Sequence, residues 1–145
     1  MKLGELLEER ARLIEEIAGL LRLRESEFME SKESPSEVRF KEITEQINQK
    51  RKELRNVKIK IMRYNLSTKI EQPEVSNLME LNLKITDLIA EIEHLRELAR
   101  CCSRGTELRP QVSAKEMRQK ISALIREKIR LDILRKMTNW ATEVD

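Results

Sequence analysis

Apolar side chains recur every three or four residues along four long stretches of this chain, and no other sequence feature narrows the possible folds as much. In an α-helix this spacing places the apolar side chains on one stripe, which must be buried against another element. The stretches cover roughly residues 2–30, 35–70, 76–100 and 113–145. The sequence therefore predicts an all-α protein with four long helices.

Composition points the same way. Charged residues make up 38% of the 145 residues, aromatic residues only 3%, and the chain has three glycines and three prolines. A sheet-based fold needs frequent turn residues and many β-branched and aromatic side chains, and this chain has few of them. Long helices coated with charged residues remain as the predicted structure.

Local signals mark the expected helix boundaries. Residues 34–37 read Ser-Pro-Ser-Glu and residues 113–116 read Ser-Ala-Lys-Glu, and both are capping boxes that satisfy free amide groups at a helix start. Pro73 separates the second helix, expected to reach about Ile70, from the third. Residues 102–112 lack periodicity and contain Gly105 and Pro110, so we expect a loop there.

Short connections between long helices favour antiparallel neighbours. The sequence thus predicts a single domain, residues 1–145, folded as an antiparallel four-helix bundle. Two long helical hairpins would build it, residues 2–71 and 76–145.

The two predicted hairpins resemble one another. A shift of 75 aligns residues 3–25 with 78–100 at nine identical positions, and a shift of 74 aligns 41–71 with 115–145 at seven. Shared heptad composition inflates such counts. However, the segments at the ends of the two hairpins, residues 65–71 and 139–145, which we call the tails, also share the pattern Asn-x-x-Thr-x-aliphatic-acid. We interpret the chain as a duplicated helical hairpin.

Charge alternates between the predicted helices. Residues 2–30 and 76–100 carry net charges of −3 and −2, whereas 35–71 and 113–145 carry +5 and +3. In an antiparallel hairpin each acidic helix then lies beside a basic one. Such flanking charges set partner choice and orientation more than they add stability.

Arg10 interrupts the apolar stripe of the first helix, as Lys50 and Lys128 interrupt those of two others. If a turn near residues 31–34 folds the first hairpin, positions whose numbers sum to about 65 face each other. This brings Arg10 beside Glu53, Leu54 and Arg55, and the acid Glu53 is then its natural partner. A charged pair in an apolar seam penalises shifted registers because slippage leaves one charge buried alone. We therefore predict an Arg10–Glu53 ion pair that fixes the register.

The tails supply further candidate interaction residues. Asn65 and Thr68 in the first tail match Asn139 and Thr142 in the second. Short polar side chains of this kind suit local capping of a helix end. The alternative is that they close contacts between the helix ends of neighbouring hairpins or subunits.

Residue types that carry most enzyme chemistry are scarce. His94 is the only histidine, and the two cysteines, Cys101 and Cys102, are adjacent rather than spaced as zinc ligands. The sequence contains neither a glycine-rich phosphate loop nor a nucleophile elbow. We predict a protein that is not an enzyme and that has no catalytic residues, cofactor or metal.

Location and partners can also be predicted. No run approaches the roughly 18 uncharged apolar residues of a membrane span, and the first residues lack the features of a secretion signal, so we expect a cytoplasmic protein. Residues 76–100 carry apolar side chains around more of the helix than one seam needs, which favours a homo-oligomer with a scaffold role. The basic run 50–63 leaves nucleic-acid binding as an alternative.

The chain resembles the septicolysin-like family of small, mostly uncharacterised bacterial helical proteins. The resemblance rests on Met1-Lys2-Leu3, on the segment 65–71, on Leu131-Asp132 and on 139–143, which includes Trp140. It implies an antiparallel four-helix bundle and assigns no catalytic residues. The family name adds a membrane-active cytolysin as a further alternative.

Overall fold

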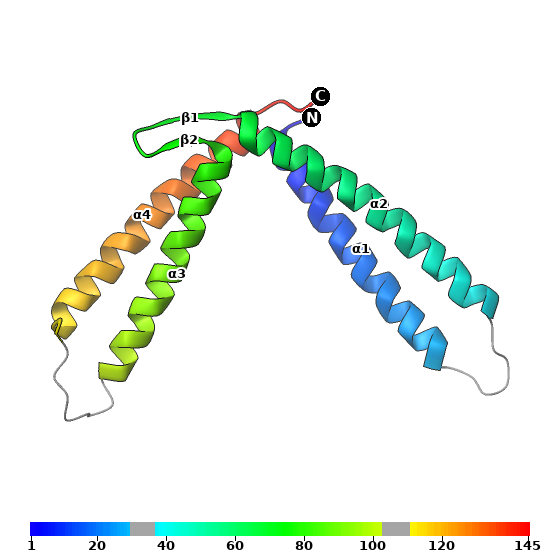
Figure 1. Cartoon of the computed structure of the whole chain (residues 1–145), viewed down its shortest axis with the longest axis horizontal. Coiled ribbons are helices and arrows are strands. Elements are labelled where there is room, and N and C mark those ends of the chain that lie inside the picture. The colour runs from blue at the N-terminus through cyan, green and yellow to red at the C-terminus, as the bar shows by residue number, and fades with distance from the viewer. Residues whose placement is uncertain (30–36, 103–110) are drawn as a thin grey trace. The chain divides into compact units, whose positions relative to one another are not determined.

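A computed structural model describes residues 1–29, 37–102 and 111–145 of the chain (Figure 1). Four helices account for most of the described residues, and a small antiparallel β-hairpin joins the second helix to the third. Their bounds are α1 Leu3–Met29, α2 Glu37–Ser67, β1 Lys69–Gln72, β2 Val75–Asn77, α3 Leu78–Cys102 and α4 Ala114–Ala141. The all-α prediction is confirmed for the described residues apart from this hairpin.

The hairpin corrects the predicted end of the second helix. That helix was expected to reach about Ile70, but α2 ends at Ser67, and the next residues form β1. Ile70 and Val75 are both buried, while Glu71 between them is exposed. The two strands therefore alternate between the core and solvent, with Pro73 in the turn between them.

The two predicted capping boxes have different outcomes. At the start of α4 the amide of Glu116 donates to Ser113 Oγ over 3.2 Å, so Ser113 caps this helix. The other box lies mostly outside the described residues, because 30–36 are not described. At the start of α3, Glu80 N donates to Asn77 Oδ1 over 2.8 Å, a cap that sequence reasoning missed.

The described chain divides into two compact units. Unit 1 comprises Met1–Tyr64 together with Trp140–Asp145, and unit 2 comprises Asn65–Asn139. Each unit therefore combines a helical hairpin with a tail that follows the last helix of the other hairpin. The packing of the two hairpins into a four-helix bundle stays a prediction.

Unit 1 is an antiparallel pair of helices, α1 and α2, that lie side by side (Figure 1). Two interhelical ion pairs, Glu16–Lys50 at 3.0 Å and Glu27–Arg39 at 3.7 Å, join residues whose numbers sum to 66. This sum is the register of the hairpin. Its buried core consists of Leu3, Leu6, Leu13, Ile17, Ile43, Ile47, Ile61 and Val144.

Unit 2 pairs α3 with α4, with the β-hairpin packed beside the start of α3 (Figure 1). Its buried core consists of Ile70, Val75, Leu78, Leu81, Ile85, Ile92, Met117 and Leu131. Lys128, predicted to interrupt the stripe of α4, bonds Asp132 over 3.0 Å, and Asp132 also accepts from Arg135 over 2.8 Å. The cation in this stripe is therefore paired, as its position requires.

Candidate interaction surface

Both tails close on the first residue of a helix in the same way. In unit 2 the amide of Leu78 donates to the carbonyl of Thr68 over 2.9 Å. In unit 1 the amide of Leu3 donates to the carbonyl of Thr142, also over 2.9 Å. Leu3 corresponds to Leu78 and Thr142 to Thr68 in the sequence repeat. These matched hydrogen bonds support a duplicated hairpin.

The residues next to these bonds also correspond. Lys69 pairs with Asn77 in the β-hairpin, and Lys2 pairs with Glu143 as an isolated antiparallel bridge. An ion pair between Lys2 and Glu143 reinforces the bridge and holds the pKa of that carboxyl below its usual range. Of the tail residues singled out in the sequence, Thr68 and Thr142 thus act through their main-chain carbonyls.

Asn65 and Asn139, the other polar tail residues, lie half-buried near the ends of α2 and α4. The roles of their side chains stay predictions.

Trp140 distinguishes the two repeats. Its ring lies against Gly4 so closely that a Cβ on Gly4 would sit 2.6 Å from ring carbon Cδ2. The corresponding residues of the other repeat are Leu66 and Met79. Unit 1 therefore combines a large tail residue with a glycine, whereas unit 2 has two side chains of intermediate size.

The predicted Arg10–Glu53 ion pair is not present in the described part of the structure. Glu53 instead lies 3.8 Å from Lys50, and Lys50 bonds Glu16 across the hairpin. In the observed register Arg10 is level with Asn56, about one turn from Glu53. Glu53 was predicted as the acid nearest the level expected for Arg10, and in the structure it pairs with Lys50 of its own helix instead.

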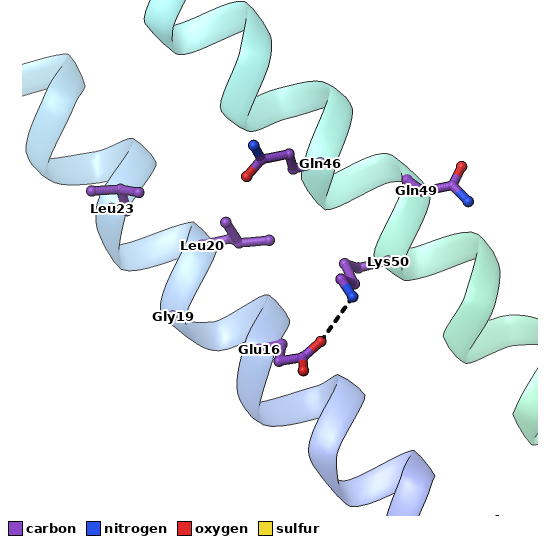
Figure 2. Close-up of a pocket in the computed structure, with 7 residues that line it drawn as sticks. All are labelled: Glu16, Gly19, Leu20, Leu23, Gln46, Gln49 and Lys50. Carbon is purple, nitrogen blue, oxygen red and sulfur yellow. Dashed lines mark ion pairs between the residues drawn. The ribbon is translucent and has the colours of Figure 1, made fainter.

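A groove of about 500 Å³ runs along one flank of unit 1 (Figure 2). Figure 2 shows Glu16 and Lys50 reaching toward each other across the gap between α1 and α2. Gly19 leaves one position of the wall without a side chain, and Leu20 and Leu23 supply apolar surface beside it. The groove can hold an apolar group beside an ion pair.

Ion pairs set the electrostatics of this flank. The ammonium of Lys50, followed by Arg12, holds the pKa of Glu16 below its ordinary value of 4.5. Arg12 also lowers the pKa of Glu9 and has its own pKa raised by that contact. Both carboxylates are therefore ionised at neutral pH, and the flank presents charge to solvent.

The opposite flank of unit 1 is different, and we call it the open face. It is formed by Leu7, Ile14 and Leu21 of α1 and by Arg51, Arg55 and Lys58 of α2. Ile14 is 47% exposed and the three cations are all exposed. No ion pair involves these cations in the part of the chain that the structure describes. The open face is thus an apolar row beside a basic row.

Unit 2 leaves apolar side chains uncovered as well. Leu83 and Ile89 of α3 are 58% and 38% exposed, and Ile129, Ile133 and Met137 of α4 form a row that is at least half exposed. The predicted surplus of apolar residues around the third helix is therefore present, although nothing in the described structure covers it.

Few groups for catalysis or metal binding come together. His94 is exposed, and Cys101 is a free, exposed thiol. Within the described ranges, no three His, Cys, Asp or Glu side chains are grouped to hold a metal ion. None of the described helices is long and apolar enough to span a bilayer.

Comparison with protein-family models, with curated proteins and with solved structures finds no match to this chain. Membership of the septicolysin-like family accordingly stays a prediction, and so does the cytolysin alternative that it brought.

Proposed function

We propose that this protein is a non-enzymatic, self-associating helical scaffold. The observation that carries the proposal is the open face of the helical hairpin, where Ile14 is 47% exposed and Leu7 and Leu21 are only half-buried. Rows of exposed apolar side chains rimmed by polar residues mark interaction sites on soluble proteins. Two copies of such a hairpin can bury their second faces against each other as an antiparallel four-helix bundle.

The mass in solution tests this proposal. Light scattering on the purified chain at micromolar concentration is expected to give a mass of at least twice 17.2 kDa, falling toward the single-chain value on dilution. The reason is that the apolar row of the open face becomes buried only when two copies associate. A mass of 17.2 kDa at every concentration would defeat the proposal.

A second candidate is nucleic-acid binding through α2. Arg51, Lys52, Arg55, Lys58 and Arg63 are exposed and form no ion pair within the described ranges, so they are available to phosphates. Binding of a labelled oligonucleotide that weakens steeply with salt would favour this candidate. The exposed Ile59 and Met62 among these cations favour a protein surface instead, because apolar side chains gain nothing beside phosphates.

A further inference from the structure

We propose that the open face of unit 1 is a two-fold symmetric interface between two copies of this chain, in which α1 of each copy lies over α2 of the other. The inference rests on the proposed self-association and specifies its surface. Two independent features carry it, namely which side chains share the face and how the charges match along the helices.

Helical spacing puts the two rows of the open face on the same side of the hairpin. Ile14 directly follows the buried Leu13, whereas the groove residue Glu16 directly precedes the buried Ile17, so they lie on opposite flanks of α1. On α2 Lys58 follows the half-buried Val57 in the same sense, and Arg51 lies on the same stripe two turns earlier. In an antiparallel pair of helices, the residues that directly follow seam residues in the sequence lie on the same side of the hairpin in both helices.

Level positions follow from the register of unit 1. Residues of α1 and α2 whose numbers sum to 66 are level along the hairpin. A two-fold axis parallel to the helices keeps every residue at its own level and brings α1 of one copy over α2 of the other. Glu8 then lies level with Lys58 of the second copy, and Glu15 lies level with Arg51 of the second copy.

These four charges are available for such contacts. Glu8, Glu15, Arg51 and Lys58 are all exposed, and none of them forms an ion pair in the described part of the chain. Because the interface is two-fold, each pair occurs twice. The heptad spacing of the two acids equals that of the two cations, so one register satisfies both pairs.

The apolar row provides the area that such an interface buries. The aliphatic stems of Arg51 and Lys58 can lie over Leu7 and Ile14 of the second copy, while their charged ends reach toward Glu8 and Glu15, which follow those two residues on the outer side of α1. Complementary charges set the register and suppress wrong pairings more than they add affinity. The interface thus has an apolar centre and a charged rim.

Unit 2 does not carry the same pattern. The positions that correspond to Leu7, Glu8 and Glu15 are Asn82, Leu83 and Ala90. Those that correspond to Arg51 and Lys58 are Ile125 and Asp132, and Asp132 is already paired with Lys128 and Arg135. The inference therefore concerns unit 1 alone, and unit 2 offers matched controls.

Charge reversal on the full chain tests the interface. One variant carries Glu8→Lys and Glu15→Lys, and another carries Arg51→Glu and Lys58→Glu. Each variant alone places like charges opposite each other at all four contacts, so we expect its dimer to dissociate at a concentration at least about tenfold higher than the wild type. An equimolar mixture of the two should form a mixed dimer, because both contacts again join opposite charges.

A chain with all four substitutions is expected to dimerise by itself for the same reason. The controls are Arg118→Glu with Arg126→Glu on α4, and Glu91→Lys with Glu93→Lys on α3, which change exposed residues of unit 2 by the same charges. They should dimerise like the wild type. Circular dichroism on every variant confirms retained helix.

The outcomes separate this inference from the proposed function. A wild type that stays monomeric defeats both. A dimeric wild type whose charge-reversed variants stay equally dimeric, or whose mixture fails to associate, overturns the interface and leaves self-association through another surface.

Discussion

Replacing Gly4 by methionine, its counterpart in the second repeat, is expected to lower the free energy of unfolding by about 1–3 kcal/mol, the usual cost of overpacking. The ring of Trp140 occupies the space of the new side chain, with a Cβ only 2.6 Å from two ring atoms. Adding Trp140→Leu recreates the Met79 and Leu66 combination of the other repeat, so we expect the double variant to recover much of the loss. Denaturant titration measures both changes.

Gly19→Ala is the matched control for this prediction. A Cβ at Gly19 has only Arg22 Nη2 nearby, at 4.0 Å, so alanine should be tolerated and gain up to about 1 kcal/mol from its higher helix propensity. If Gly4→Met and Trp140→Leu acted additively, the two residues would not be in contact, and the difference between the repeats would lose its structural explanation.

Leu81→Ala is expected to lower the free energy of unfolding by about 2–5 kcal/mol, the range for truncating a buried leucine. Leu81 is completely buried between α3 and the rest of unit 2, so its removal leaves a cavity. Leu83→Ala makes the same chemical change two residues along the same helix, where the side chain is 58% exposed.

Leu83→Ala should therefore cost less than about 1 kcal/mol, because little buried surface is lost. The comparison is made by urea unfolding of both variants beside the wild type. Equal losses at the two positions would mean that the seam of unit 2 runs along a different face of α3.

Helix number and the faces turned to the cores could be predicted from spacing alone. Leu3, Leu13 and Ile17 lie on the predicted stripe of α1 and are all buried. The cap at Ser113 could also be predicted, because its hydroxyl acts on an amide only three residues away. Such local signals need no knowledge of how the helices pair.

The β-hairpin could not be predicted in the same way. Its strands have four and three residues, too few for a periodic pattern, and Ile70 and Val75 are buried only because unit 2 packs beside them. The apolar spacing of the second helix was followed as far as about Ile70, whereas α2 ends at Ser67 and Ile70 belongs to β1. Tertiary contacts therefore determine the secondary structure of this segment.

Recognition of the candidate surface required the register of α1 against α2, which the sequence does not specify to within one residue. An assumed sum of about 65 places Arg10 beside residues 53–55, among which Glu53 is the acid, whereas the observed sum of 66 pairs Lys50 with Glu16. The same number brings Glu8 level with Lys58 and Glu15 level with Arg51. The open face could be recognised only when the flank and the level of each side chain were known.

Isotope-resolved cross-linking tests the central claim most directly. Light and heavy full-length chains are mixed, and a carbodiimide then joins carboxylates to neighbouring lysine amines. We predict linked peptides that combine one light and one heavy chain and that join Glu8 or Glu15 of α1 to Lys52 or Lys58 of α2. Links between these residues that always carry a single isotope, or no links between them at all, would contradict assembly through the open face.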